Sequence, residues 1–195
     1  MILTLEEFWG RICVRRMDLF APVSAVSSQT AGGQVIRARS FGADLWKADV
    51  QLYGNRAAQA RAVRALLMLA QQPGTVIEVS DRNYRGYDRV VTVASKASDN
   101  RRVVLAGLDR GFVFAPGDMV SIGHSLHAVT AADPANAAGQ CTVWLMPHLP
   151  PSVVVGAVVE VRRPKMLAVV DQIKPAQFTR VLAGESSFAI TQVHL

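Results

Sequence analysis

From residue 75 onward the chain is a succession of short segments rich in Val, Ile and Leu, separated by Gly, Asp, Asn and Pro. Segments of this kind, recurring roughly every ten residues, are typical of β-barrels and β-sandwiches. No longer unit repeats along the chain, which argues against a solenoid. We expect strands over residues 75–79, 89–94, 102–108, 118–122, 126–130, 141–146, 153–161, 166–170 and 188–195. The sequence therefore predicts a mainly β fold.

The clearest strand in the first third of the chain covers residues 46–52, where apolar and polar residues alternate. Because side chains alternate across a strand, the pattern predicts a half-buried strand with Trp46 as a core anchor. Trp144, in a later strand, is expected to be a second anchor. Residues 34–39 also alternate, whereas residues 21–33, rich in Ser, Ala, Gly and Thr, are expected to form a connection with turns.

Residues 56–72 carry the pattern of an amphipathic helix, which Pro73 and Gly74 end. Its expected apolar stripe consists of Ala58, Ala62, Leu66 and Leu69. Leu66, in the middle of the stripe, is a further candidate core anchor. The polar face is rich in arginine, a residue enriched at protein interfaces, although a solvated face is the alternative. The candidate subunit-interface residues are Arg56, Arg61, Arg64 and His194.

The composition excludes several classes of protein. Half of the 195 residues are hydrophobic, which excludes intrinsic disorder, and no apolar run is long enough for a transmembrane helix or a signal peptide. The formal net charge is +6, but no basic run is interleaved with aromatics, so the usual footprint of a nucleic-acid binder is weak. The two cysteines, Cys13 and Cys141, are expected to be reduced and buried.

No assembled catalytic constellation is recognisable. The four histidines lack metal-ligand spacing, and neither a nucleophile elbow nor a phosphate-binding glycine loop occurs. Asp118 follows Gly117 in a turn, where a carboxylate usually bonds its own backbone. We therefore expect no enzyme activity, no metal and no cofactor. An enzyme that uses Cys141, His124 or His148 remains the weakest alternative.

Two stretches indicate two sub-domains. Residues 74–87 follow the helix with a long polar loop, and residues 163–175 return through Pro164 and Pro175 to a final strand. We expect a β-sandwich built from residues 1–80 and 171–195, flanked by the helix, and a small β-barrel inserted over residues 81–170. The last strand would then pair back into the first sheet.

Several segments, in this order, carry a resemblance to a known family. They are SFGADLWKADVQL (40–52), NRAAQARAVRALLMLAQQPG (55–74), APGDMVSIGHSLHAVT (115–130), AAGQCTVWLMPHLP (137–150) and SFAITQVHL (187–195). The motif residues are Gly117, Asp118, Gly123, Gly139, Thr142, Val143 and Pro147. Over residues 35–195 this order resembles tail proteins of tailed phages and prophages, of the distal tail kind.

The resemblance implies a virion part rather than an enzyme. Distal tail proteins form a ring, often hexameric, between the tail tube and the tip hub, and their β-sandwich is akin to the tail-tube fold. The implied partners are copies of the chain itself, the tail tube protein and the hub protein, with DNA only in transit and no membrane. The implied location is the virion tail, assembled in the bacterial cytoplasm. The high apolar fraction agrees, because obligate ring subunits hide apolar surface against their neighbours.

Two alternatives stay open. The barrel could be a tail-associated module that recognises host-surface carbohydrate. The chain could also form another tail-tube-like layer rather than the distal ring.

Overall fold

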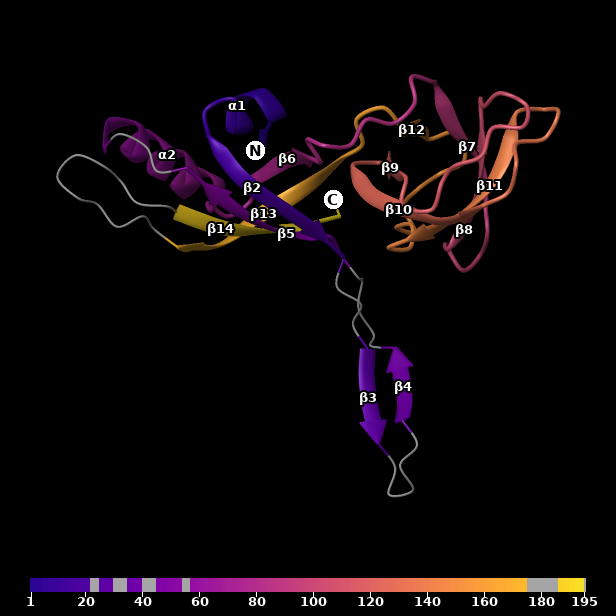
Figure 1. The fold of residues 1–195 in the computed structure, drawn as a ribbon, viewed down its shortest axis with the longest axis horizontal. Helices are drawn as coiled ribbons and strands as arrows, with labels where there is room; N and C mark the ends of the chain where they lie inside the picture. The colour runs from indigo at the N-terminus through magenta and orange to yellow at the C-terminus, as the bar shows by residue number, and fades with distance from the viewer. Residues whose placement is uncertain (22–24, 30–34, 40–44, 54–56, 175–185, 195) are drawn as a thin grey trace.

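The computed structural model describes residues 1–21, 25–29, 35–39, 45–53, 57–174 and 186–194. These residues form a six-stranded sheet with two helices, a closed six-stranded barrel and a separate two-stranded hairpin (Figure 1). The sheet and the barrel lie side by side, and the hairpin stands away from both. The mainly β class and the small barrel are confirmed. In place of the expected sandwich, the described residues hold a single sheet covered by helices.

The sheet joins strands from both ends of the chain. Its order is β1 (Ile2–Leu3), β6 (Val76–Ser80), β13 (Lys165–Lys174), β14 (Ser186–Gln192), β5 (Lys47–Leu52) and β2 (Val14–Phe20). The β1–β6 pair is parallel and the other pairs are antiparallel. The C-terminal strand thus pairs back into the first sheet, between two strands that are distant from each other in the sequence.

One face of the sheet carries the larger core. The alternation predicted for residues 46–52 is present, and Trp46, at 7% exposure, is buried as expected. Directly opposite residues in an antiparallel pair share a face, so Val50 and its partner Phe188 point into the same core. Phe8 and Trp9 complete it, with the rings of Phe8 and Phe188 in a T-shaped contact at 6.1 Å.

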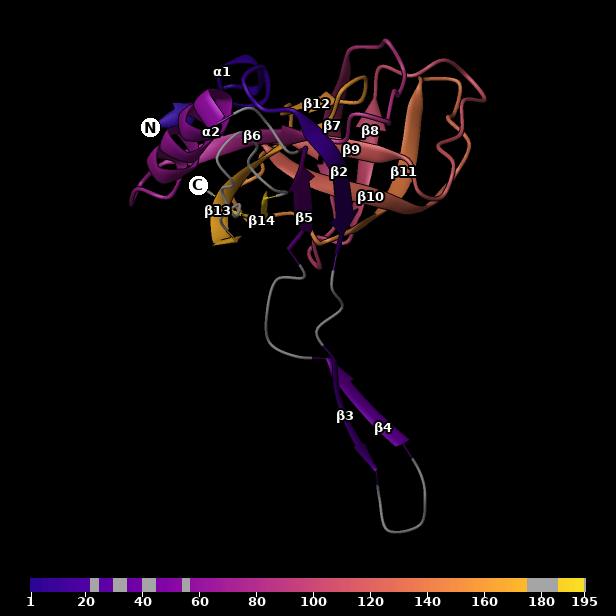
Figure 2. The same cartoon turned by 60° about the vertical axis from the view of Figure 1, so that its left-hand side comes forward.

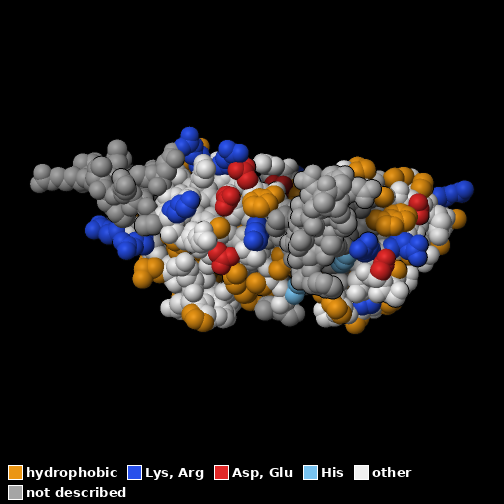
Figure 3. Space-filling view, turned by 90° about the horizontal axis from the view of Figure 1, so that it is seen from below, with side chains coloured by type: hydrophobic (Ala, Val, Ile, Leu, Met, Phe, Trp, Pro, Cys, Tyr) orange, Lys and Arg blue, Asp and Glu red, His pale blue; other side chains and the backbone are white. Residues whose placement is uncertain are grey.

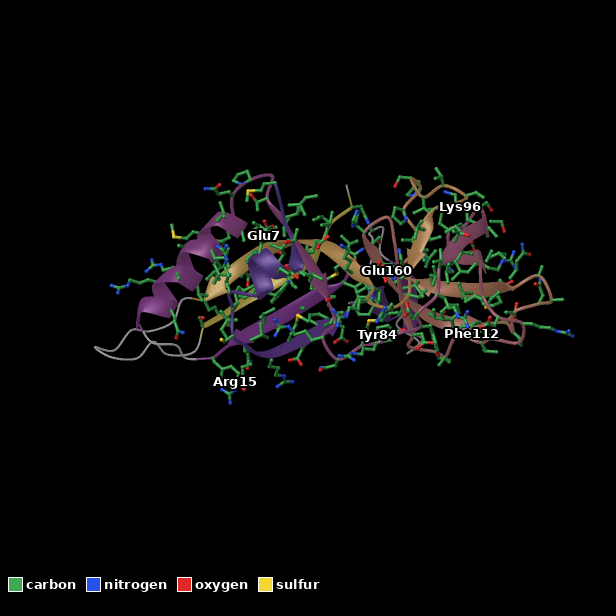
Figure 4. All side chains as sticks on the ribbon, turned by 90° about the horizontal axis from the view of Figure 1, so that it is seen from above. Glu7, Arg15, Tyr84, Lys96, Phe112 and Glu160 are labelled. Carbon is green, nitrogen blue, oxygen red and sulfur yellow. The ribbon has the colours of Figure 1, made fainter. Side chains whose placement is uncertain are left out.

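Helix α1 (Leu5–Trp9) was not predicted, although its start carries a recognisable signal. Thr4 and Glu7 form a capping box, in which each side chain bonds the other's backbone N–H. The hydrogen bonds that Thr4 donates to the carboxylate of Glu7 lower the pKa of that group. Figure 4 labels Glu7 at helix α1, to which it belongs. The indole Nε1 of Trp9 donates to the carbonyl oxygen of Glu78 at 2.7 Å, which fixes the helix against β6.

Helix α2 (Ala57–Ala70) lies where a helix was expected, but its buried stripe is different. Val63, Leu67 and Ala70 are buried, whereas Ala62 is exposed and Leu66 is only half-buried at the edge of the core. The prediction that Leu66 anchors the core was therefore wrong. Both stripes obey the helical period, and the choice between them depends on how the helix is rotated over the sheet, which the sequence does not state.

The barrel has its own core. Its strand order is β10 (Ser125–Ala132), β11 (Gln140–Met146), β8 (Arg102–Ala106), β7 (Val91–Lys96), β12 (Val158–Glu160) and β9 (Met119–Ile122). In β11, Cys141 and Val143 are buried inside the barrel, so Trp144 points outward and is half-buried. The prediction that Trp144 anchors the core was wrong, because the smaller residues Cys141 and Val143 occupy the inward-facing positions of β11. The strand expected over 153–161 is confined to β12.

The barrel lies in the sequence between β6 and β13. These two strands are neighbours in the sheet, with Ser80 opposite Lys165. Because β13 begins at Lys165, the expected domain boundary at residue 170 falls inside a sheet strand. Leu126, a barrel residue, is fully buried in the core of the sheet. The two units are therefore packed together as well as linked.

The hairpin consists of β3 (Ala25–Gln29) and β4 (Val35–Arg39), which pair from Ala25 opposite Arg39 to Gln29 opposite Val35. The strand expected over 34–39 is confirmed by β4. Residues 21–33 were expected to form only a connection, and finding β3 there corrects that expectation. Small and hydroxyl residues are compatible with a strand when its partner is adjacent in the sequence.

Two motif glycines allow a matched test of the barrel turns. Gly117 and Gly139 both have positive φ, at 96° and 70°. A Cβ on Gly139 would collide with the carbonyl oxygen of Leu108, whereas open space surrounds Gly117. Gly117→Ala is expected to lower the free energy of unfolding by about 1 kcal/mol through backbone strain alone, and Gly139→Ala by about 2–3 kcal/mol. Urea unfolding of both variants measures the difference, and equal losses would contradict this account.

Candidate functional site

The hairpin of β3 and β4, hereafter the arm, is the most unusual feature of the molecule. Figure 2 shows it extending from the β2 and β5 side of the sheet, away from both sheet and barrel. Among the described strands, its backbone ladder joins β3 and β4 to each other alone. An isolated two-stranded hairpin is at best marginally stable in water, so a partner surface is the natural source of its stability.

A second feature is the face of the sheet opposite the helices, hereafter the open sheet face. In the four strands β2, β5, β14 and β13 it consists of Arg16, Asp18, Phe20, Lys47, Asp49, Gln51, Val169, Asp171, Lys174, Ser187, Ala189 and Thr191. These side chains are exposed or half-buried. A sheet that is apolar on one face and polar on the other is the usual state of an antiparallel sheet with one wet face.

A row of carboxylates crosses the open sheet face. Asp18 lies opposite Asp49, Asp49 opposite Ala189, and Ala189 opposite Asp171. Arg16 pairs with Asp18 at 2.7 Å, and Thr191 donates to Asp171 at 2.7 Å. Like charges directly opposite each other destabilise a sheet, so the Asp18–Asp49 pair works against stability. The ion pair from Arg16 offsets the charge of Asp18.

The exposed side of α2 holds two of the candidate interface residues. Arg61 and Arg64 are exposed, next to Met68, whose side chain is 62% exposed. Arg56 lies outside the described residues. An exposed methionine beside arginines is a composition that interfaces favour. Since α2 covers the core face of the sheet, these residues lie on the opposite side from the open sheet face.

The junction between sheet and barrel contains buried polar groups. Gln192 donates from its amide Nε2 to the hydroxyl of Ser125 at 2.7 Å. His127 lies inside the barrel, and its Nδ1–H donates to the carbonyl oxygen of Pro147 at 2.7 Å. Its Nε2 is buried without a hydrogen-bond partner. Burial, with smaller contributions from His194 and His148, lowers the pKa of His127 to about 4 against the opposing effect of its hydrogen bond to Pro147. The ring is therefore neutral at pH 7.

The remaining candidate residues are His194, the two cysteines and Asp118. His194 is exposed beside a cavity of about 210 Å³ that Gly123 and Val153 also line. Cys141 is buried, and burial raises the pKa of its thiol. Cys13 is exposed, which corrects the expectation that it would be buried. Asp118 accepts the backbone N–H of Ala115 at 2.9 Å, the turn role expected for it.

Two further findings concern metal ions and membranes. Within the part of the chain that the structure describes, no three His, Cys, Asp or Glu side chains are close enough to share a metal ion. No described helix has the length and apolar character that crossing a bilayer requires. Figure 3 shows Lys and Arg interspersed with Asp and Glu on the face from which the arm leaves, without a large patch of one sign.

Sequence reasoning missed the arm and the carboxylate row. A strand is present on both sides of residues 30–34, and only the alternation of 34–39 was a usable signal. Asp18, Asp49 and Asp171 come from three distant segments and meet only through strand register. Neither the protein-family models nor the curated proteins include a match to this chain.

Proposed function

We propose that this chain is a structural subunit of a phage-type tail. It would be a ring protein of the distal tail kind that joins the tail tube to the tip hub and leaves a channel for DNA. The observation that carries the proposal is the arm, a hairpin that extends from the body and whose two strands pair with each other and with no other described strand. An isolated hairpin is at best marginally stable, and in a ring a neighbouring subunit would supply the surface that stabilises it.

The open sheet face supports the same role. In a ring, the polar face of the sheet would line the channel. Its three aspartates, Asp18, Asp49 and Asp171, are balanced by the cations Arg16, Lys47 and Lys174, so the face would neither trap nor strongly repel the phosphates of passing DNA. The helix α2 would then lie on the outside, with Arg61 and Arg64 turned away from the channel. The role is mechanical and needs no catalytic group. It would place the chain in the virion tail, between the tube protein and the hub.

Removal of the arm tests the proposal. The full chain is expected to form rings at high concentration, measured by light scattering after size exclusion and by electron microscopy. A variant in which residues 25–39 are replaced by a short Gly-Ser linker is expected to remain monomeric. Its melting temperature should be unchanged, because β3 and β4 pair with no other described strand.

A charge variant on the barrel provides the control. Arg110→Ser removes an exposed cation from the barrel and should leave ring formation intact. If the full chain stays monomeric at every concentration, or if the arm-deleted chain assembles as the full chain does, the proposed function is wrong.

A further inference from the structure

The outer surface of the barrel contains a groove that the proposed ring role does not use. It has a volume of about 300 Å³ and lies across β7, β8 and β11. Its lining residues are Ser95, Lys96, Ala97, Arg102, Val104, Asp133, Thr142 and Trp144. Lys96, at one rim, lies at the barrel end of the molecule, away from α2 (Figure 4). The outside of a small barrel is normally convex, so a hollow there needs a local cause.

Irregularities in two strands shape the groove. A β-bulge between Val93 and Ser95 shifts the register of β7, so that Ser95 lies opposite the outward-facing Val104. A second bulge, between Val129 and Ala131, lies in β10 beside Trp144. Bulges redirect side chains and are over-represented next to binding sites. The ammonium group of Lys96 is also held in place, since it donates to the carbonyl oxygen of Pro151 at 2.9 Å.

The side chains in the groove combine a flat aromatic surface, the indole of Trp144, with charged groups. Trp144 and Arg102 are direct cross-strand partners, so both side chains leave the outer face of the barrel at neighbouring positions. Asp133 lies at the groove's other side, where its backbone N–H donates to the carbonyl of Thr142. No ion pair joins Arg102 or Asp133 to another described side chain. Arg102 and Asp133 thus line one groove with opposite charges, and the carboxylate of Asp99, which is not in the lining, also attracts Arg102.

We propose that this groove binds an acidic saccharide, a sugar whose ring carries a carboxylate. The apolar face of the sugar ring would lie on Trp144, and its carboxylate would accept hydrogen bonds from Arg102, whose planar guanidinium suits a carboxylate. The sugar hydroxyls would donate to Asp133 and bond the hydroxyls of Ser95 and Thr142. Lys96 and Arg102 are the two cations in the lining, and of these Arg102 is the one placed beside Trp144 to meet the carboxylate of a ligand.

The same groove is a poor fit for single-stranded DNA. Stacking on Trp144 and a cation are features that both ligands use. A nucleic-acid strand needs a basic groove that follows its backbone, however, and here Asp133 would face the phosphates. The volume lies at the lower end of small-molecule sites, which favours one or two sugar rings over a longer chain.

Binding of matched sugars to the full chain tests the proposal. The probes are the disaccharides cellobiouronic acid and digalacturonic acid, with cellobiose and digalactose as their neutral counterparts, and a short thymidine oligonucleotide. Titration is followed by calorimetry and by tryptophan fluorescence. Trp9 and Trp46 are buried at 7% exposure each, so a fluorescence change reports chiefly on Trp144. At least one acidic disaccharide is expected to bind about tenfold more tightly than its neutral counterpart.

Matched variants locate the site. Arg102→Gln is expected to weaken binding of the acidic sugar about tenfold, and Trp144→Leu to abolish it. Arg101→Gln, an exposed arginine beside the groove but not in it, should bind as the unaltered chain does. Unchanged melting temperatures exclude a folding defect, and a Trp144→Phe variant with residual binding serves where Trp144→Leu is unstable.

Three outcomes would overturn the proposal: no acidic disaccharide binds at millimolar concentration, the neutral sugars bind equally well, or the oligonucleotide binds more tightly than any sugar. Sugar binding and ring assembly are tested separately. If the chain forms rings but binds no sugar, only the proposal for the groove is wrong. If it binds sugar but always stays monomeric, only the proposed assembly role is wrong.

Discussion

Replacing Phe8 by alanine is expected to lower the free energy of unfolding by about 3–5 kcal/mol. Phe8 is fully buried and lies between Trp9 and Phe188, with ring centroids at 5.0 Å and 6.1 Å in T-shaped contacts. The short helix α1 has too few residues to be stable alone, so its aromatic side chains are what attach it to the sheet. Truncation would leave a cavity in the largest core and loosen the helix.

Urea denaturation followed by circular dichroism measures the loss. Phe20→Ala is the matched control, since Phe20 is 44% exposed on the edge strand β2. The control should change stability by no more than about 0.5 kcal/mol. Equal losses for the two variants would show that the aromatic cluster does not anchor α1.

Acidification is expected to destabilise the protein through His127. Its pKa is lowered to about 4 by burial inside the barrel, from an ordinary value near 6.5. Between these two values the unfolded chain binds a proton that the folded chain rejects, so stability is complete above pH 6.5 and is lost as the pH falls toward 4. The full shift corresponds to roughly 3 kcal/mol. Desolvation lowers the pKa of His194 as well, and this contribution has the same sign.

The contribution of His127 is isolated by a difference measurement. His127→Asn retains a donor for the carbonyl of Pro147 but cannot be protonated. The unfolding free energy of the unaltered chain should therefore fall more steeply from pH 6.5 to 4 than that of the variant. His124→Asn is the control, because His124 is exposed with φ at 64°, a conformation that Asn tolerates. Parallel pH profiles for all three proteins would contradict the assignment to His127.

The sequence specified the local elements better than their arrangement. The alternation of residues 46–52 identified strand β5 and its buried face, because the period of two is a property of the strand itself. The position of helix α2 was likewise predicted from its ends, but not its rotation, since Leu66 and Leu67 each fit an apolar stripe. Packing against the sheet beneath the helix determines which of the two stripes is buried.

Features that depend on distant pairing were not accessible from sequence. The carboxylate row needs the register of β2, β5, β14 and β13 together. The groove depends on where bulges interrupt the barrel, and Trp144 looked like a core residue because aromatic residues in strands often are. In each case a shift of one residue would reverse which side chains face outward.

The point at which the barrel enters the sheet has an evolutionary consequence. Ser80 and Lys165 are neighbours across the ladder of β6 and β13, so a tight turn between them would preserve every strand pairing of the remaining sheet. A lineage could therefore gain, discard or exchange the whole barrel at this point without redesigning the scaffold. Leu126 sets the condition for such an exchange, because any replacement must supply an apolar side chain to fill its place in the sheet's core.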